Sequence, residues 1–551
     1  MINADVYGFS VTGSAADNRD AVVAMLTAAA GLPCVVTAST DFEMDRVTLN
    51  PLAFDIDLTF EGSGRQLRLT SGAFALTAEI ANIQSISGFA RASRTIDGNT
   101  TTLTRVAVPD SSGYAKGSAV KIVSDDVDPD ARDTSGRRGE FATVADVSTG
   151  YIWLNEVLED YGLYLTSPRI GKLSKRKVSI KNHRVQSAYS NAAAQMYSIN
   201  NLVDAYLELD VQDHGWTAIA LNGCVQSKVD FSGSGKGDSD KSLGYGILDH
   251  GGARNRLRVR GSGWRHIITT GHNGATAGGD MRLFGAARDM LVLDSVAAGC
   301  TNAAYDDHEG ARRSKFVRCA SYGAKNGTNA GRFAFQGRGR DVRIIDCYAD
   351  ASHDAMVNVT SAALGALVVE GGRSDCPPLY SSSTTPMAVI LDNHVSEDGA
   401  SMLGGSNLTV SVIGGSYTLN TGGNNGKVLD VCGGSTWTLN GPEFILDGDG
   451  SSERFVYLRD PEGSPAGKVF GSLRTRNRKS SGTVQAIVRS DIAAGQVARL
   501  KVLHLEGTRP SPNSGSFSSG ALSYAVHDAV GGSHVTNITT VDDLAKLLAA
   551  V

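Results

Sequence analysis

The sequence lacks the features of a disulfide-bonded, zinc-binding or membrane-spanning protein. Its seven cysteines are an odd number, are scattered along 551 residues, and include no Cys-x-x-Cys pair. We therefore expect small buried thiols, made in a reducing cytoplasm. No apolar run reaches the ~18 residues that cross a membrane. The start, MINADVYGFS, lacks the basic and apolar segments of a signal peptide.

Proline, aromatic residues and net charge are also low. The chain has 13 prolines, 7% aromatic residues and a net charge of -5, so bulk charge favours neither nucleic acid nor membrane as a partner. Glycine is abundant, with 64 residues, and 41% of the chain is hydrophobic. This composition predicts many tight turns between short strands that share a core.

The N-terminal segment predicts one helix followed by a strand. Asp17 and Asn18 can cap a helix, apolar residues then recur at helical spacing from Ala21 to Ala29, and Gly31 ends it. The segment ADVYGFSVTGSAADNRDAVVAMLTAAAG resembles the N-terminal cap of the pectate-lyase-like β-helix superfamily, which includes many phage tailspikes. Its Thr12-Gly13 stands where that family has Asp-Gly. A cap would cover the open end of a β-helix.

From about residue 200 the sequence becomes periodic. Short apolar segments end at Gly261, Ser295, Cys319, Cys347 and Gly371, in steps of 34, 24, 28 and 24 residues. This period, without amphipathic helices, predicts an all-β solenoid: a right-handed parallel β-helix with the cap helix. We expect four parts: 1–104, the cap and first coils; 105–172, a small inserted β-domain; 173–450, the main β-helix; and 451–551, the last coils and a C-terminal region with a terminal helix.

The same register aligns side chains of successive coils. An arginine precedes each small residue by seven positions: Arg254, Arg288, Arg312 and Arg340. The columns further upstream place Asp249, Leu283, Asp307, Phe335 and Val359 inward. They place Arg282, His250, Asp306, His308, Gln336 and Asn358 outward on one face.

The run Tyr305–Gly310 concentrates the groups that cleave polysaccharides. A glycosidase needs two carboxyl groups, which Asp306 and Glu309 could supply with His308 positioning one of them. A lyase needs a base and a cation that neutralises a uronate, which His308 with Arg338 or Arg340 could supply. A structural Asp-His-Arg network is the alternative without chemistry. We favour hydrolysis slightly, with Asp306, His308 and Glu309 as catalytic residues.

Residues 306–347 resemble a motif of phage β-helix depolymerases. DDHEGARRSKFVRCASYG is followed one coil later by RFAFQGRGRDVRIIDC. The resemblance implies that His308, Glu309, Arg338 and Arg340 contact substrate. To these we add further candidate contacts from the aligned columns: Arg282, Arg312, Gln336, His250 and Asp307. Trp264, at a coil turn, is added as a candidate ring for stacking on a sugar. The histidines are not at metal-ligand spacing, so we expect no metal and no cofactor.

The window 252–345 is basic. It holds sixteen Lys and Arg residues against seven Asp and Glu, a balance of +9 in a chain of net charge -5. A basic stripe on a solenoid suits a linear polyanion, although stacked arginines could equally bridge the coils.

These observations predict a phage tailspike-type depolymerase that binds and cleaves a bacterial surface polysaccharide. We expect a homotrimer in the virion tail or baseplate, made in the host cytoplasm without a signal peptide. The rivals are a polysaccharide lyase acting on an acidic polymer and a non-catalytic adhesin of the same fold.

Overall fold

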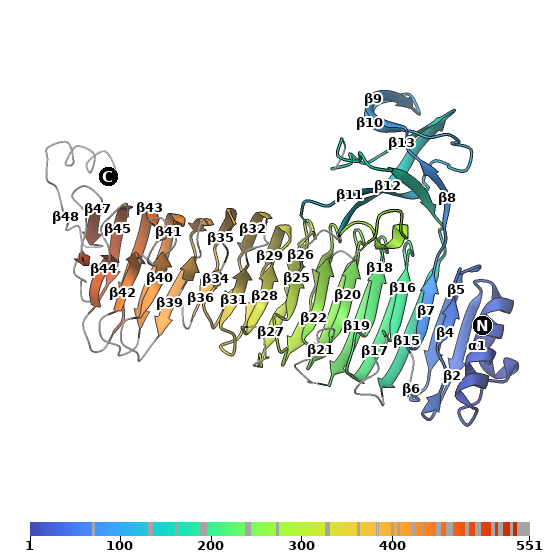
Figure 1. The fold of residues 1–551 in the computed structure, drawn as a ribbon. Helices are drawn as coiled ribbons and strands as arrows, with labels where there is room; N and C mark the ends of the chain where they lie inside the picture. The colour runs from blue at the N-terminus through green and yellow to red at the C-terminus, as the bar shows by residue number, and fades with distance from the viewer. Residues whose placement is uncertain are drawn as a thin grey trace. The chain divides into compact units, whose positions relative to one another are not determined.

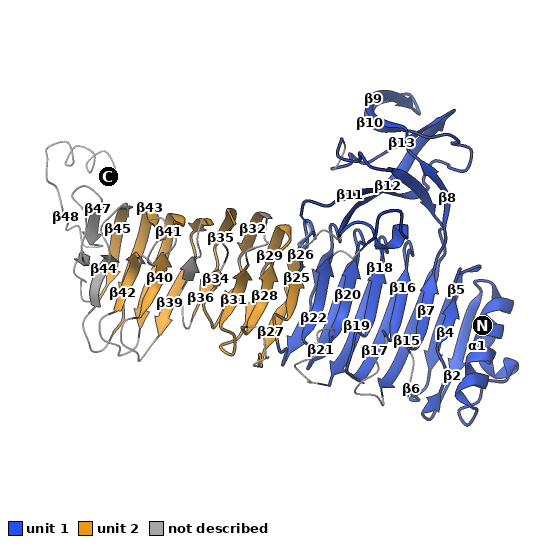
Figure 2. Cartoon of the chain, in the orientation of Figure 1, with its two compact units in different colours: residues 1–301, 307–314 blue, residues 302–306, 315–551 orange. Residues whose placement is uncertain are grey.

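Most of the chain is built from short parallel strands that return to equivalent positions once per coil. The computed structural model describes residues 1–68, 72–130, 136–159, 162–187, 195–236, 244–271, 275–325, 331–360, 364–381, 383, 385–397, 402–404, 408–420, 426–431, 434–447, 453–458, 467–479, 484–490, 497–507, 513–515, 522–528 and 533–536. They form two compact units: residues 1–301 with 307–314, and residues 302–306 with 315–551 (Figure 2). The predicted terminal helix at 539–551 lies outside the described residues.

The first unit contains coils of a parallel β-helix (Figure 1). One sheet is formed by β1 (Ile2–Asn3), β2 (Pro33–Thr37), β3 (Phe42–Glu43), β5 (Ile56–Glu61), β6 (Gln66–Arg68), β15 (Val178–Ser187), β17 (Tyr206–His214), β19 (Lys228–Gly235), β21 (Arg256–Ser262), β23 (Leu291–Leu293) and β24 (Val296–Ala298). The other is formed by β4 (Val47–Leu49), β7 (Phe74–Thr77), β16 (Tyr197–Asn200), β18 (Ile219–Asn222), β20 (Tyr245–His250) and β22 (His266–Gly271), with β25 (Tyr305–Asp307) crossing the unit boundary.

The helices are short and few in the described part of the chain: η1 (Ala4–Tyr7), α1 (Ala15–Ala29) and η2 (Met281–Leu283). The predicted N-terminal helix is α1. Its N-cap is Ser14, whose hydroxyl accepts from the Asp17 amide, so the predicted caps Asp17 and Asn18 lie inside the helix instead. The helix buries Val22, Met25 and Leu26. No helix in the described residues has the length and apolar composition needed to cross a lipid bilayer.

Alternation along each strand builds the core of the first unit. Over residues 206–211 of β17, 228–233 of β19 and 256–259 of β21, every second residue is buried. Leu207 pairs with Val229, Val229 with Leu257 and Leu257 with Val292, so these four side chains stack along the coils. Parallel pairing in register thus turns a period of two along the strand into continuous buried columns.

The second unit continues the same construction (Figure 1). Its strands are β26 (Lys315–Val317), β27 (Ala320–Tyr322), β28 (Phe333–Gly337), β29 (Arg340–Ile345), β30 (Tyr348–Ala349), β31 (Ala355–Val359), β32 (Leu364–Glu370), β33 (Arg373–Ser374), β34 (Leu379–Ser381), β35 (Met387–Asp392), β36 (Val395–Ser396), β37 (Met402–Gly404), β38 (Leu408–Ile413), β39 (Ser416–Asn420), β40 (Lys427–Val431), β41 (Thr436–Asp447), β42 (Glu453–Leu458), β43 (Lys468–Asn477), β44 (Val484–Ser490), β45 (Val497–Glu506), β46 (Asn513–Gly515), β47 (Leu522–Asp528) and β48 (Ser533–Thr536). Their pairing is parallel except between β47 and β48. The predicted parallel β-helix is confirmed.

Small residues of the repeat such as Cys319 and Cys347 directly follow a corner of the coil, where one residue has a left-handed backbone. Asp346 and Arg318 have left-handed backbones, with φ of 51° and 52°, and join β29 to β30 and β26 to β27. The next residues, Cys347 and Cys319, point into the core and are each 1% exposed. The Cys319 amide donates to the Cys347 sulfur at 3.3 Å, so the predicted stacking of these two thiols is confirmed.

A seven-stranded antiparallel sheet interrupts the coils of the first unit, where Figure 1 shows it as a separate lobe. Its strands are β8 (Ile80–Ser85), β9 (Gly88–Ile96), β10 (Asn99–Ala107), β11 (Ala119–Val127), β12 (Arg137–Ser148), β13 (Tyr151–Leu154) and β14 (Arg169–Leu173). The sheet begins with β8 at Ile80, whereas the prediction assigned residues up to 104 to the cap and the first coils. The hairpin of β9 and β10 turns at Asp97-Gly98, both with positive φ, and β9 has no buried residue.

Candidate functional site

The predicted run Tyr305–Gly310 contains residues of both units, and each part is described within its own unit. Asp306 belongs to the second unit, whereas residues 307–314 belong to the first. Strand β25 ends at Asp307, and the chain then leaves the sheet in a turn.

In the first unit this turn holds an imidazole against a carboxylate. The Ala311 amide donates to the His308 carbonyl at 3.1 Å, which closes the turn, and Gly310 supplies the positive φ of 86° that it requires. His308 Nδ1 contacts Glu309 Oε2. The His308 side chain is 37% exposed and that of Glu309 only 3%, so the imidazole faces solvent and the carboxylate orients it from below.

A second polar layer lies beneath His308. The Thr270 hydroxyl donates to Asp307 Oδ1 at 3.0 Å and accepts from the His308 amide at 3.2 Å. Asp307 is fully buried, which agrees with its predicted inward column but not with substrate contact. Thr270 pairs with Asp249, which is also buried, and burial raises the pKa of Asp249 to about 7.

His250 shares the surface of His308. It pairs with Gly271, and a β-carbon added to Gly271 would lie 3.4 Å from His308 Cβ and 3.8 Å from His250 Cδ2. Gly271 therefore separates the two imidazoles without filling the space between them. The predicted proximity of His250 and His308 is found, but the residue between them was expected to be Phe284.

Arg282, Leu283 and Phe284 were assigned to the wrong place. They lie in or directly after η2, while Thr269, Thr270 and Gly271 of β22 occupy the corresponding coil position. Arg282 pairs with Asp280 and is 33% exposed. The prediction failed because HIITTG was not recognised as a strand. The repeat was instead counted back from Ser295 into the segment between β22 and β23, which contains Arg282, Leu283 and Phe284.

In the second unit, Asp306 forms a bidentate pair with Arg338. Arg338 Nε donates to Asp306 Oδ1 at 3.1 Å, and Nη2 donates to Oδ2. The side chains are 11% and 1% exposed. An ionised carboxylate held in this way is a poor proton donor, which argues against Asp306 as a general acid.

A polar column follows on the strands of the second unit. Gln336 pairs with Asn358, and Asn358 with Tyr380. Tyr380 is 36% exposed, and its ring lies against that of Phe333 at 5.6 Å between centroids. An exposed, supported aromatic ring suits the apolar face of a sugar. Sequence reasoning missed Tyr380, although its spacing of 22 residues from Asn358 repeats the spacing of Asn358 from Gln336.

The arginine column is only partly as predicted. Arg288 pairs directly with Arg312, but Arg288 pairs with Ala253, so Arg254 is one residue out of register. Arg340 begins β29 in the second unit and is half-buried. Arg312 is 2% exposed and contacts Asp128 at 3.1 Å and Asp130 at 3.0 Å, so its guanidinium is not available for the predicted substrate contact.

The basic stripe is largely compensated by acids from elsewhere in the chain. Arg254 pairs with Glu156, Arg288 with Glu140, and Arg343 with Glu370. These acids lie outside the window 252–345, so counting charge within the window overestimated the positive potential.

Trp264 belongs to the core. It is 1% exposed, and its ring lies 6.2 Å from that of Phe231 and 6.5 Å from that of His214. It is therefore a packing residue and not the predicted sugar contact.

One further cluster in the second unit has the connectivity of a hydrolase triad. Ser321 Oγ and His353 Nε2 are 2.8 Å apart, and His353 Nδ1 lies 2.9 Å from Asp350 Oδ1. Ser321 is 2% exposed, however, and the His353 side chain is fully buried. No substrate carbonyl can approach the hydroxyl, so we assign this cluster to packing.

The fold has solved counterparts. The Gp54 tailspike of Acinetobacter baumannii bacteriophage AP22, in complex with A. baumannii capsular saccharide, aligns with a TM-score of 0.56 and 12% identity, over 95% of this chain and 79% of that one. The tailspike protein gp49 of Pseudomonas phage LKA1 aligns with a TM-score of 0.54 and 15% identity, over 96% and 84%. The gp61 tailspike of Pseudomonas phage phi297 gives 0.51 and 12%, over 95% and 84%.

The chain has a phage tailspike fold. No family model and no curated protein matches its sequence. At these identities the likeness to tailspikes is one of fold, and function depends on the residues of the site.

Proposed function

We propose that the chain is a tailspike-type protein that binds and cleaves a bacterial surface polysaccharide, with His308 as the proton-transfer residue. The observation that carries the proposal is the contact between the half-exposed His308 imidazole and the buried Glu309 carboxylate. A carboxylate behind an imidazole fixes its tautomer and orientation and stabilises its protonated form, which is what a general base requires. His250, across Gly271, completes the polar surface. The likeness to tailspike folds supports a long polymer of the host surface as the ligand and the virion tail as the location, and we propose that the protein acts there as a trimer.

Burial favours elimination over the hydrolysis that the sequence indicated. Hydrolysis needs two carboxyl groups that reach the glycosidic bond. Glu309 is 3% exposed, and Asp306 is 1% exposed and paired with Arg338. An exposed imidazole supplies the base that removes the C5 proton next to a uronate carboxylate. The C4–C5 double bond then forms as the C4–O bond breaks, and the leaving oxygen takes a proton from solvent. We therefore propose β-elimination of an acidic polysaccharide as the reaction.

The test is to incubate the protein with a panel of capsular polysaccharides and lipopolysaccharides. Cleavage is measured in two ways, as new reducing ends and as ultraviolet absorbance. Elimination raises both, because it leaves an unsaturated uronate, whereas hydrolysis raises only reducing ends. We expect His308→Gln to lower the rate by roughly 10²–10⁴-fold, the range for a positioned general base. Glu309→Gln should also lower the rate, because it removes the carboxylate that orients His308. Glu208→Gln, on the outer face of β17, is its matched control and should leave the rate unchanged.

Two results would overturn parts of this proposal. If the protein binds polysaccharides but produces new reducing ends from none of them, it is an adhesin. Full activity of His308→Gln would exclude His308 as the proton-transfer residue.

A further inference from the structure

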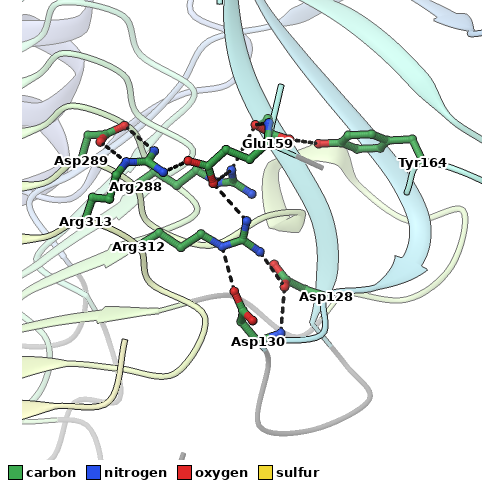
Figure 3. A network of polar contacts seen from close by, with 9 residues as sticks. Asp128, Asp130, Glu159, Tyr164, Arg288, Asp289, Arg312 and Arg313 are labelled. Atoms are coloured by element: carbon green, nitrogen blue, oxygen red, sulfur yellow. Dashed lines mark hydrogen bonds and ion pairs between the residues drawn. The ribbon is translucent and has the colours of Figure 1, made fainter. Parts of the chain in front are cut away.

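The inserted sheet contacts the β-helix of the first unit through a buried ionic network (Figure 3). Arg312 contacts three carboxylates: Asp128 at 3.1 Å, Asp130 at 3.0 Å and Glu159 at 3.1 Å. Asp128 and Asp130 follow β11, and Glu159 follows β13, so all three belong to the insert. Arg312 is 2% exposed, which makes this contact one of the most deeply buried ionic interactions in the described chain.

Glu159 connects this contact to two more arginines. Its carboxylate lies 2.9 Å from Arg288 Nη1 and also contacts Arg313 Nη1. Arg313 is held from its other side by Asp289, at 2.6 Å from Nε and 2.9 Å from Nη2. Figure 3 shows the three guanidinium groups gathered around Glu159. One side chain of the insert thus bridges three arginines of the coils.

The network lies directly beside the proposed reacting group. Arg312 and Arg313 are the residues that follow the turn from His308 to Ala311. The backbone on the upstream side of that turn is fixed by Thr270, which accepts from the His308 amide. On the downstream side Arg312 donates its amide to the Ala287 carbonyl at 2.9 Å, and its side chain is held by the insert. The turn is therefore anchored at one end by the β-helix and at the other by the β-helix together with the inserted domain.

We propose that the inserted domain positions the catalytic turn, and that Glu159 and Arg312 are the positioning residues through which it acts. The idea rests on the proposed role of His308. Buried, multiply bonded ion pairs impose one geometry, because a guanidinium that loses a partner in a dry site is left uncompensated. An imidazole that is held by its backbone turn moves when the turn moves, and small displacements of a reacting group are costly in rate. The insert would then be needed for turnover without touching the polysaccharide at the reacting bond.

The test is Glu159→Gln in the full-length protein. This change keeps the shape of a side chain that is 32% exposed, so it should fold. We expect kcat on the cleaved polysaccharide to fall roughly ten- to a hundredfold with KM within about twofold. Glu159→Asp, which keeps the charge, should recover part of the loss. The matched control is Glu156→Gln, which removes another acid of the insert. Its partner is Arg254, at 3.1 Å, which is remote in sequence from the turn, whereas the partners of Glu159 include Arg312 and Arg313.

Hydrogen exchange provides a readout that does not depend on activity. Peptides covering 305–313 should exchange faster in Glu159→Gln than in the wild type and in Glu156→Gln, while peptides from β17 remain unchanged. Unchanged exchange at 305–313, or equal kinetic effects of Glu159→Gln and Glu156→Gln, would overturn the positioning role. If the wild type cleaves no polysaccharide, the proposed function fails instead, and exchange alone decides whether Glu159 holds the turn.

Discussion

Asp249 should make the stability of the first unit fall as pH rises towards neutrality. Asp249 is 1% exposed, and this burial raises the pKa of its carboxyl group. The hydrogen bonds from Asn255 Nδ2, at 2.9 Å, and from the Gly252 amide lower the pKa, but by less. The pKa is raised from 3.8 to about 7. Below pH 4 the carboxyl is protonated in the folded and the unfolded chain alike, so Asp249 has no pH-dependent effect there.

Between pH 4 and 7 only the unfolded chain loses the proton, so the free energy of unfolding decreases as pH rises. Each pKa unit corresponds to about 1.36 kcal/mol, so a shift from 3.8 to about 7 gives an upper limit of about 4 kcal/mol, fully lost above pH 7. Asp249→Asn removes this contribution and leaves the other carboxyl groups in place. The variant should therefore gain stability relative to the wild type as pH rises from 4 to 8.

The assay is urea unfolding of both proteins across that range, monitored by tryptophan fluorescence, to which the first unit contributes three of the four tryptophans. The difference between the two midpoints isolates Asp249 from every other titrating group. Asn255→Leu is unsuitable as a control, because Asn255 also accepts from the Ser227 amide. A pH-independent difference, or one that grows as pH falls, would refute the reasoning.

Three other expectations are simpler to check. Trp264→Ala should lower the free energy of unfolding by about 3–5 kcal/mol through the cavity it leaves, and affinity for the polysaccharide should persist in the folded fraction; a fully stable variant would contradict its placement in the core. Light scattering should give three times the chain mass of 57.7 kDa, and the monomer mass at micromolar concentration would exclude the trimer. A fluorophosphonate probe should leave Ser321 unlabelled in the folded protein, because only 2% of the residue is exposed, and labelling would show that the Ser321 cluster opens.

The fold was predictable because buried apolar and small residues recur along the sequence with the period of the coils. A buried column needs one inward residue per coil, so positions such as Cys319 and Cys347 mark the coils in the sequence. The register was less secure. Gly371 aligns with Asp346 and not with Cys347, because Ile345 pairs with Glu370. Arg254 is likewise shifted by one residue. Coils of variable length permit such shifts without disturbing the core.

The candidate site was predictable only where its residues are neighbours in sequence. The contact of His308 with Glu309 follows from adjacency, and that of His250 with His308 from the repeat. The pair between Asp306 and Arg338 spans 32 residues. The ion pairs of Arg312 reach 184 residues back to a domain of unrelated periodicity. Nothing in the pattern around Arg312 distinguishes a surface cation from one that is buried against an insert.

The hydrogen-bond ladder has a mechanical consequence for the second unit. Its backbone hydrogen bonds run between neighbouring coils. A force along the stack is therefore carried by every coil in turn. Within one coil, the force is divided among the hydrogen bonds of that coil's strands. The coils that include β30 (Tyr348–Ala349), β33 (Arg373–Ser374) and β36 (Val395–Ser396) have two-residue strands on one side. Under tension the molecule should therefore yield first between these coils, one at a time, while the stretch built from the ten- and twelve-residue strands β43 and β41 holds.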